Sequence, residues 1–272
     1  IARYSEDIYS ESGRRLDMEK NMREATANGC DEFEIYFQPI MDIQGEMAVC
    51  TGAEALVRWN SLRQGFMTPA DFLPLAEYLG LINPIGNYVL TESCKYCKMW
   101  NDEGHPEFHV NVNFSAAQLL QNNIVDIVEK ALNDTGLRPA NLILDVTEKL
   151  AVDDLERMKE IVTKLKGLGI QIALDDFGIG CSSLNHIREI PFDIVKVDKS
   201  YALQLTESAY AQSFVKMIAD LAQTLEIDVC VEGEEGPAQY RTLHGAKVKF
   251  VQGYYFDKPL PRRAFEEKYV RR

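Results

Sequence analysis

Eight short apolar segments lie along the chain, and each carries or ends in a polar or charged side chain. They are residues 34–40, 52–59, 109–115, 142–148, 171–177, 194–200, 228–233 and 250–256. Their polar members are Gln38, Glu54, Arg58, Asn113, Asp145, Glu148, Asp175, Asp176, Lys196, Glu232 and Gln252. Buried parallel strands are nearly continuous apolar runs, so a charge inside one needs a partner, an ion or a water-filled opening to offset its desolvation. The repeated pattern predicts a barrel in which every strand brings a residue to one shared site.

The length of the chain and the spacing of the segments favour a single α/β domain. Helix-length stretches separate the strands, and residues 155–165 and 214–225 carry apolar side chains at helical spacing. A (β/α)8 barrel typically has about 250 residues, close to the 272 of this chain. We therefore expect a TIM-like (β/α)8 barrel over residues 30–272.

Residues 1–29 precede the barrel and form a separate lead. Residues 1–15 are polar, charged and rich in Ser, Glu and Arg, a composition that buries too little apolar surface to fold alone, so we expect a connector there. Residues 16–27 favour a helix that Asn28 and Gly29 can end. Because the chain begins at Ile1 without a methionine, we expect it to be a piece of a longer protein.

Charge and cysteine usage limit the partners of the chain. The formal net charge of −13 and the pI near 4.9 argue against DNA or RNA polymers and anionic membranes, which repel an acidic surface. The six cysteines have no spacing typical of a secreted scaffold, so we expect reduced thiols and a cytoplasmic domain. Apolar runs stay well short of the about 18 residues that cross a bilayer, although segments outside this chain could anchor a full-length protein.

Cys94 and Cys97 form a CxxC within residues 88–103, whose pattern is helical. Two turns of a buried helix face explain the pair better than zinc or redox chemistry, because no second pair follows. The four histidines share no ligand spacing. Any metal is therefore expected to be hard and oxygen-bound, with magnesium or manganese favoured over zinc.

The acids predict such a metal site. Asp175 and Asp176 are adjacent at a strand end and cannot both stay ionised cheaply unless positive charge is near, which a divalent cation supplies; a helix cap with a salt bridge is the alternative. Further oxygen donors at equivalent strand positions are Glu54, Asn113, Asp145 and Glu232. Lys196 is either a structural ion-pair partner or a group that orients water and phosphate. Two cations about 3.5–4 Å apart activate water and stabilise both oxygens of a phosphodiester displacement, so the pattern predicts a metal-dependent phosphoester hydrolase.

Several motifs resemble the EAL-domain family, the bacterial cyclic di-GMP phosphodiesterases. The signature itself is Glu54-Ala55-Leu56 within GAEALVRW, residues 52–59. Other matching strings follow in the family's order over roughly residues 32–268: YFQPI (36–40), PADFLPLAEYLGLI (69–82), VNVNFS (110–115), DDFG (175–178), SSL (182–184), VKVD (195–198), EG (232–233) and QGY (252–254). The resemblance implies a TIM-like barrel with an irregular, antiparallel first strand that converts cyclic di-GMP to linear pGpG with Mg²⁺ or Mn²⁺ and is inhibited by Ca²⁺.

The resemblance also implies roles for single residues. One cation is held by Glu54, Asn113, Asp145 and Asp175, and a second by Asp175, Asp176 and Glu232. Lys196 lies near the attacking water, and Gln252 supports that water or the metal shell. The dinucleotide is gripped by Gln38, Arg58 and Glu235. Glu148 anchors the loop at 176–183, which in this family links the site to a homodimer interface, and an upstream module precedes the lead, a GGDEF domain being one candidate.

Three departures from the family pattern bear on activity. Asp145 stands where the family usually has Glu, which sets a ligand back by about 1.5 Å and predicts weakened metal affinity, because Mg²⁺ requires near-ideal octahedral distances. Ile179 and Cys181 replace the more usual Thr and Tyr of the loop. Residues 231–236 read VEGEEG in place of AEGVET, which adds negative charge beside the nucleotide.

These features leave three hypotheses. The first is an active phosphodiesterase, favoured by the retained acids, Lys196 and Gln252. The second is a regulatory module that binds cyclic di-GMP but has lost turnover through Asp145 and the altered loop. The third is an interaction scaffold that binds no nucleotide, against which the polar residues of the pocket weigh.

Overall fold

The computed structural model describes residues 2–147, 155–179 and 184–271, without the side chains of residues 2–14, 116 and 184–186. The strands are β1 (Phe33–Asp42), β2 (Val49–Ser61), β3 (Gly65–Met67), β4 (His109–Phe114), β5 (Leu142–Thr147), β6 (Gln171–Phe177), β7 (Ile194–Val197), β8 (Asp228–Glu232), β9 (Phe250–Gln252) and β10 (Leu260–Pro261). The helices are α1 (Ala2–Ala27), α2 (Pro69–Tyr78), α3 (Ile82–Asp102), α4 (Ala116–Leu119), α5 (Ile124–Thr135), η1 (Pro139–Asn141), α7 (Leu155–Lys166), α8 (Leu184–Glu189), α9 (Lys199–Gln204), α10 (Ala209–Leu225), α11 (Pro237–Gly245), α12 (Arg262–Phe265) and η2 (Glu266–Val270).

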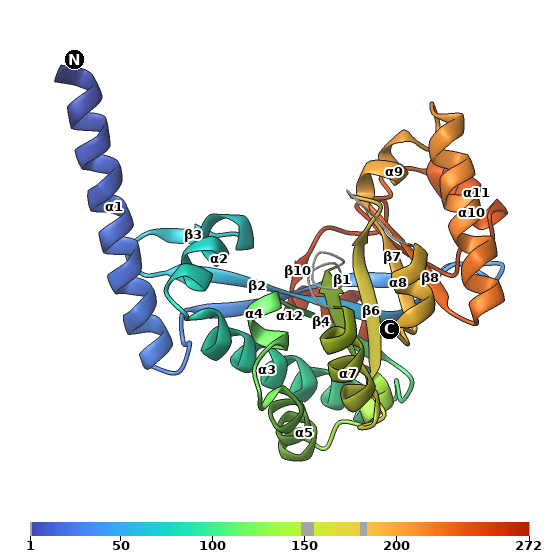
Figure 1. The fold of residues 1–272 in the computed structure, drawn as a ribbon, viewed down its shortest axis with the longest axis horizontal. Coiled ribbons are helices and arrows are strands. Elements are labelled where there is room, and N and C mark those ends of the chain that lie inside the picture. The colour runs from blue at the N-terminus through green and yellow to red at the C-terminus, as the bar shows by residue number, and fades with distance from the viewer. Residues whose placement is uncertain (1, 148–154, 180–183, 272) are drawn as a thin grey trace.

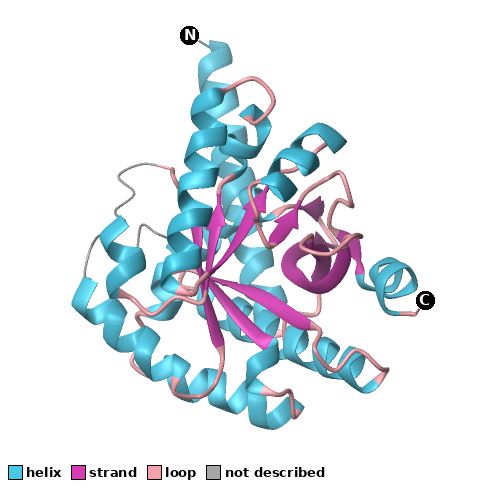
Figure 2. Cartoon of the chain, turned by 90° about the vertical axis from the view of Figure 1, so that its right-hand side faces the viewer, coloured by secondary structure: helices cyan, strands magenta, loops and turns pink. Residues whose placement is uncertain are grey.

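The strands close into the predicted barrel. The order is β1-β9-β8-β7-β6-β5-β4-β2, and β2 pairs back to β1, while β3 and β10 extend the sheet at its edges. β1 is antiparallel to both β2 and β9, whereas the other neighbours around the barrel are parallel. Helices surround the strands on the outside (Figure 2). The TIM-like barrel with an antiparallel first strand is therefore confirmed.

Some element boundaries differ from the prediction. The segment at 194–200 is strand only to Val197, because Asp198 caps α9 by accepting a hydrogen bond from the Ser200 N–H at 2.8 Å. The segment at 250–256 ends as a strand at Gln252, and β2 runs on to Ser61 to make a hairpin with β3.

Helix α1 begins at Ala2, so the helix expected over residues 16–27 starts earlier than predicted. The helix leads away from the barrel (Figure 1), and its C-terminal end is anchored by Met22 and Ala25, which are buried. Glu and Arg are good helix formers. Once the C-terminal turn of α1 is anchored, the helix can therefore continue toward the N-terminus through the polar residues that precede it. Gly29 and Cys30, both with positive φ, end the helix.

An apolar layer closes the barrel beneath the site. Six buried side chains form a cluster separate from the core that lies between strands and helices: Ile40, Ile143, Ala173, Ile194, Cys230 and Phe250. Each lies two residues from a polar side chain on the same strand, and strand side chains two apart share a face. The paired polar residues are Gln38, Asp145, Asp175, Lys196, Glu232 and Gln252. The polar groups therefore gather at one end of the barrel, above an apolar floor.

The outer core explains the CxxC pair. Cys94 and Cys97 are fully buried on α3, and the Cys97 thiol donates to the Phe108 carbonyl oxygen at 3.3 Å. Burial raises the pKa of Cys94 to about 12 and that of Cys97 further still. Both thiols are thus packed helix-face groups, as the sequence indicated. Among the described helices, none is long and apolar enough to span a bilayer.

Candidate active site in the barrel mouth

The ammonium group of Lys196 lies at the centre of the polar cluster. Its Nζ is 2.7 Å from Glu232 Oε1 and 2.8 Å from Asp145 Oδ2. Glu54 Oε2 lies at 3.5 Å and Asp175 Oδ1 at 3.6 Å. Four strands, β2, β5, β6 and β8, thus deliver a carboxylate to one lysine of β7, and the convergence expected from the sequence is present for these five residues.

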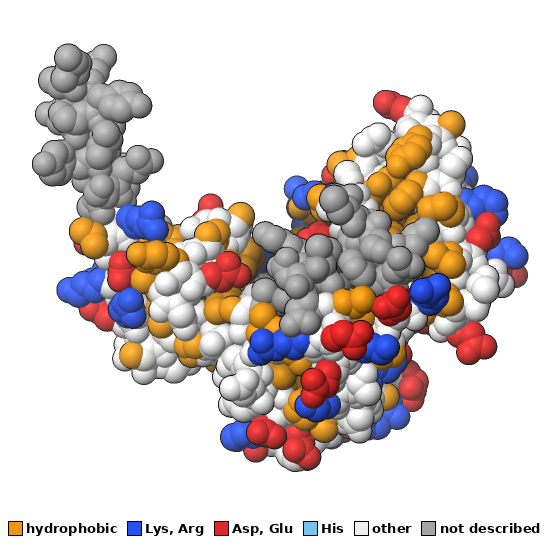
Figure 3. All heavy atoms as spheres, viewed as in Figure 1, with side chains coloured by type: hydrophobic (Ala, Val, Ile, Leu, Met, Phe, Trp, Pro, Cys, Tyr) orange, Lys and Arg blue, Asp and Glu red, His pale blue; other side chains and the backbone are white. Residues whose placement is uncertain are grey.

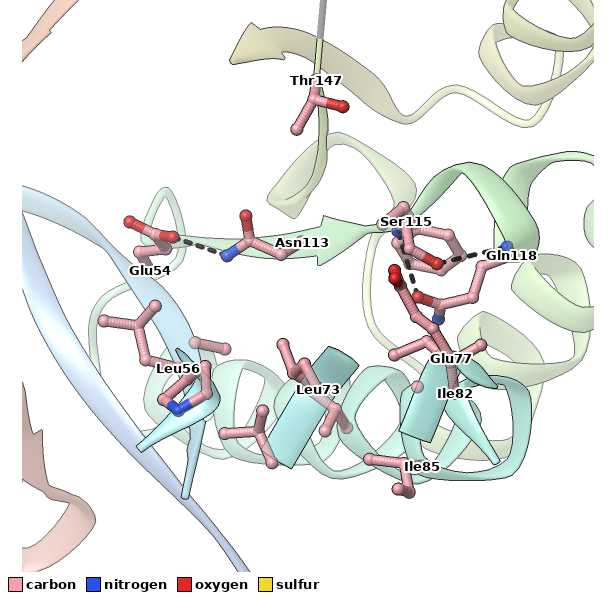
Figure 4. A pocket seen from close by; sticks show the side chains of 16 residues that line it. Glu54, Leu56, Leu73, Glu77, Ile82, Ile85, Asn113, Ser115, Gln118 and Thr147 are labelled. Atoms are coloured by element: carbon pink, nitrogen blue, oxygen red, sulfur yellow. Dashed lines mark hydrogen bonds between the residues drawn. The ribbon is translucent and has the colours of Figure 1, made fainter. Parts of the chain in front are cut away.

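Amide side chains orient Glu54. Asn113 Nδ2 donates to Glu54 Oε1 (Figure 4), and Gln252 Nε2 donates to Glu54 Oε2. The same Gln252 nitrogen reaches Gln38 Oε1 at 3.1 Å, and Gln38 donates to the Asp257 carbonyl oxygen. Register explains this set, because Gln38 lies opposite Glu54 in the antiparallel β1–β2 pair.

Asp145 is engaged at both oxygens. Its Oδ2 meets Lys196, and its Oδ1 accepts a 2.7 Å hydrogen bond from Asn111 Nδ2. Asn111 was missed by the sequence reasoning. The available signal is its place in VNVNFS two residues before Asn113, which puts both amides on one face of β4.

The acid pair at the end of β6 has special backbone geometry. Asp176 has φ 57°, and its N–H donates to Asp175 Oδ1 at 2.8 Å. The β6–β7 register shifts between Leu174 and Phe177, so strand alternation is interrupted there. Asp175 is buried, whereas Asp176 is exposed.

The cluster holds more acidic groups than cations, and most of its carboxyl groups have a raised pKa. Burial raises the pKa of Glu232 to about 8 and that of Asp145 to about 7, against the opposing pull of Lys196. Burial likewise raises the pKa of Asp175 and of Asp176. Glu54 differs from these acids. Burial by itself would raise the pKa of Glu54, but Lys196 and the amides of Asn113 and Gln252 bring that pKa below its ordinary value.

Lys196 responds in the opposite sense. Burial would lower the pKa of its ammonium, but Asp145, Asp175 and the other acids outweigh burial and hold that pKa well above its ordinary value. The surrounding acids therefore favour the charged form of the lysine. One ammonium does not balance the four acids around it once they are all ionised, and a divalent cation would supply the missing charge.

The donor set fits a hard cation in its chemistry. All donors are carboxylate or amide oxygens, the set that Mg²⁺ and Mn²⁺ prefer. Within the described part of the chain, no three acidic, His or Cys side chains already form a cation cage. The carboxylates instead gather around Lys196, so they must turn toward an ion to bind it.

Two cavities flank Glu54 and Leu56. One, of about 380 Å³, is lined by Gln38, Glu54, Leu56, Asp175, Lys199, Leu203, Glu232, Gly233, Glu235, Gln252, Gly253 and Tyr254. The other, of about 330 Å³, lies between β2, α2, α3 and the end of β4 (Figure 4) and is mostly apolar. Its lining includes Asn113 and Glu77. Lys199, which directly follows the VKVD motif, was not among the predicted site residues.

The remaining predicted residues fall in different places. Glu235 lines the 380 Å³ cavity, and its N–H donates to Gln239 Oε1 at 2.8 Å. Arg58 lies further along β2, with its guanidinium carbon 5.4 Å from the centre of the Tyr36 ring, and lines neither cavity. Glu148 and Cys181 lie outside the described residues.

Comparisons with known proteins identify the family of the chain. The family model of the EAL domain matches residues 19–259. The chain is 34% identical to the cyclic di-GMP phosphodiesterase NbdA of Pseudomonas aeruginosa over 97% of this chain and 33% of NbdA. It is 33% identical to the cyclic di-GMP phosphodiesterase PdeR of Escherichia coli over 94% of this chain and 38% of PdeR. The chain thus spans about a third of the length of these curated relatives.

A solved structure is similarly close. The phosphodiesterase PaMucR in its c-di-GMP complex superposes with a TM-score of 0.83 and 33% identity, covering 90% of this chain and 99% of that one. The family model and the solved structure thus agree on the family and on the fold. The chain belongs to the EAL-domain family.

Proposed function

We propose that this domain hydrolyses cyclic di-GMP to linear pGpG in a reaction that depends on a divalent cation. The observation that carries the proposal is the convergence of Glu54, Asp145, Asp175 and Glu232 on Lys196 in a barrel mouth. The phosphodiesterase names of NbdA and PdeR and the ligand of the PaMucR structure support the choice of substrate.

The oxygen donors divide into two sets in this proposal. Glu54, Asn113 and Asp175 hold one cation, with Asp145 at the family's fourth position. The second cation takes Asp175, Asp176 and Glu232. Mg²⁺ or Mn²⁺ suits these donors, and Ca²⁺, whose coordination is larger and less regular, is expected to inhibit.

The two cavities suit a ligand with two bases. They lie on either side of Glu54 and Leu56, so a dinucleotide spanning both would carry one phosphodiester past the acids. Gln38 and Glu235 line one cavity and are proposed to contact the nucleotide. Arg58 reaches neither cavity as placed, and its proposed phosphate contact requires its side chain to leave Tyr36.

Hydrolysis adds a water oxygen to one phosphorus, breaks the bond from that phosphorus to the 3′ oxygen, and transfers a proton to the leaving 3′ oxygen. Bound cations would supply hydroxide near neutral pH and stabilise charge on both oxygens. Lys196, charged and fixed by its acids, orients the attacking water and a phosphate oxygen. Gln252 holds Glu54 and Gln38 in place, and Glu148 is proposed to anchor the loop after Asp176.

The surroundings of the domain are proposed from the same family assignment. Residues 1–29 join the barrel domain, residues 30–272, to an upstream signalling module of the GGDEF type in a longer cytoplasmic protein or protein region. A homodimer is proposed over α9 and α10, where Figure 3 shows an apolar patch. Leu203, Tyr210 and Met217 are exposed there by 48%, 70% and 46%.

A second function, a cyclic di-GMP-binding module without turnover, is favoured by one observation. Both oxygens of Asp145 are taken by Asn111 and Lys196, which leaves a weaker set for a cation. In either case the fragment binds the dinucleotide in the barrel mouth and is not expected to bind DNA, RNA or membrane.

Hydrolysis of cyclic di-GMP followed by chromatography, with Mn²⁺, with Mg²⁺ and with EDTA, tests the proposal. We expect pGpG to form only with a cation and Glu54→Ala to abolish turnover. Glu160→Ala, exposed on α7, is the matched control. Turnover that persists in Glu54→Ala would defeat the assignment, and binding by calorimetry without turnover in Mn²⁺ would select the second function.

A further inference from the structure

Asn111 is the polar exception among the side chains directly beneath the site residues, where the His109 ring also fills the space in front of Gly52. Site side chains on the eight barrel strands each have a same-face neighbour two residues deeper in the barrel. Those neighbours are Ile40, Gly52, Asn111, Ile143, Ala173, Ile194, Cys230 and Phe250. Asn111 is 2% exposed, and its Oδ1 has no hydrogen-bond partner among the described residues. Burying an amide in such a place costs free energy, and the hydrogen bond to Asp145 is the interaction of this side chain, within the described residues, that offsets the cost.

Asp145 is turned toward this floor. β4 and β5 pair with Asn113 opposite Asp145 and Asn111 opposite Ile143, so the Asn111 amide lies one step below Asp145. The 2.7 Å bond to Asn111 therefore draws the carboxylate down and away from the level of Asn113. The other carboxylate oxygen contacts Lys196 at 2.8 Å.

Accessibility separates Asp145 from the other acids. The side chain of Asp145 is 0% exposed, against 8% for Glu54, 11% for Asp175 and 21% for Glu232. The cavities agree with this order, because Glu54, Asp175 and Glu232 line the 380 Å³ cavity and Asp145 lines neither one. A cation entering from the mouth meets the other three acids first.

We propose that Asn111 is a positioning residue that fixes Asp145 as the buried partner of Lys196, so that cation binding rests on the remaining donors. The inference rests on the proposed function of the site but departs from the family's ligand set at one position. The shorter side chain of Asp145 and the Asn111 amide act as a unit. Asp145 forms an ion pair with Lys196, and Asn111 fixes Asp145 through a hydrogen bond.

The first experiment measures binding of Mn²⁺ alone by calorimetry and by Mn²⁺ electron paramagnetic resonance, in Asp145→Asn and in Asp175→Asn. We expect the Kd to change less than about threefold in Asp145→Asn and to rise at least about tenfold in Asp175→Asn, the size of effect that loss of a metal-site group produces. A rise in Asp145→Asn equal to that in Asp175→Asn would overturn the proposal. This experiment does not depend on turnover. If the wild-type domain is inactive, the proposed function is wrong, but the comparison of Mn²⁺ affinities still tests the role of Asn111 and Asp145.

The second experiment tests whether Asn111 acts through Asp145. Asn111→Leu keeps the size of the side chain and removes the donor. We expect kcat to fall about tenfold or more with KM little changed, and we expect this loss to vanish when Asn111→Leu is added to Asp145→Asn. Equal losses of kcat in both backgrounds would overturn the proposal, because Asn111 would then act independently of Asp145.

A readout independent of turnover completes the second experiment. The Lys196 ammonium loses its fixed partner in Asn111→Leu, so the pKa of Lys196, followed by NMR of the ¹⁵N-labelled side chain, is expected to move toward its ordinary value. If Asn111→Leu does not fold, Asn111→Ser, with a shorter donor, takes its place and is expected to retain more activity than Asn111→Ala. Unchanged Lys196 resonances in a folded variant that lacks the amide would also contradict the proposal.

Discussion

Tyr201 donates its hydroxyl hydrogen to the carbonyl oxygen of Gly178 at 3.2 Å. Gly178 lies two residues after Asp176, with φ 103°. The Tyr201 ring also stacks on Phe214, with ring centres 4.0 Å apart, and so joins the end of β6 to α10. The backbone that carries the acid pair is thus held by an aromatic residue of α9.

Gly178→Ala tests this support. A Cβ at residue 178 would lie 2.5 Å from the Tyr201 ring, and the positive φ is strained for alanine. We expect a loss of about 1–3 kcal/mol in the free energy of unfolding together with reduced turnover, measured by urea unfolding and the hydrolysis assay.

Tyr201→Phe is the milder companion of that variant, because it keeps the ring stack and removes the hydroxyl that bonds to Gly178. Its expected cost is about 1 kcal/mol. If Gly178→Ala is as stable as the wild type, the predicted clash between a side chain at residue 178 and the Tyr201 ring is wrong.

Without added metal, stability should fall as pH rises from about 5 to 8. The pKa of Glu232, about 8, and that of Asp145, about 7, lie above their ordinary values. The folded protein therefore keeps protons that the unfolded chain has already released, and stability drops across this window. Urea unfolding in EDTA at several pH values measures the fall. Mn²⁺ should reduce it, since the cation favours the ionised acids; a curve that rises with pH would contradict the account.

Glu234 should destabilise the fold above neutral pH. Its side chain is fully buried, both carboxylate oxygens lack a hydrogen-bond partner within the described residues, and burial raises its pKa to about 7. Moving the pKa from 4.5 to about 7 corresponds to about 3 kcal/mol that the folded state loses between those pH values. Glu234→Gln should recover part of this loss at pH 8 and little at pH 5.

Glu235→Gln is the matched control for Glu234→Gln, because Glu235 is exposed and directly adjacent. Its melting temperature should change little at either pH. If Glu235→Gln and Glu234→Gln stabilise equally, general relief of negative charge explains the gain, and burial of Glu234 does not.

Lys196→Met should lower stability most at high pH. Removing the ammonium leaves Asp145 and Glu232 buried without their counter-charge, and loss of one partner from a buried ion pair costs about 3–5 kcal/mol. At pH 5 the acids are largely protonated and the cost should shrink. Chemical unfolding at pH 5 and pH 8 measures the difference, with exposed Lys216→Met on α10 as the control.

The sequence by itself determined the barrel and the set of acids. Side chains along a regular strand alternate between its two faces, so the apolar runs that carry Glu54, Asp145 and Glu232 predict that these acids lie on the inner face of the barrel. The motif order then specified the family. The helix boundary of α1 was predicted less well, because helix propensity is weak until tertiary contacts such as that of Met22 anchor one end.

Only the tertiary structure decided which of these side chains touch. Contacts across a closed barrel depend on the register of every strand pair. The register shifts add up around the barrel, and the local sequence does not encode their sum. Lys196 therefore emerged at the centre of four acids, and Asp145 was found turned toward Asn111. Glu234 was found buried with no hydrogen-bond partner for its carboxylate within the described part of the chain. The sequence supplied the groups, whereas the long-range pairing of strands decided which of them became partners.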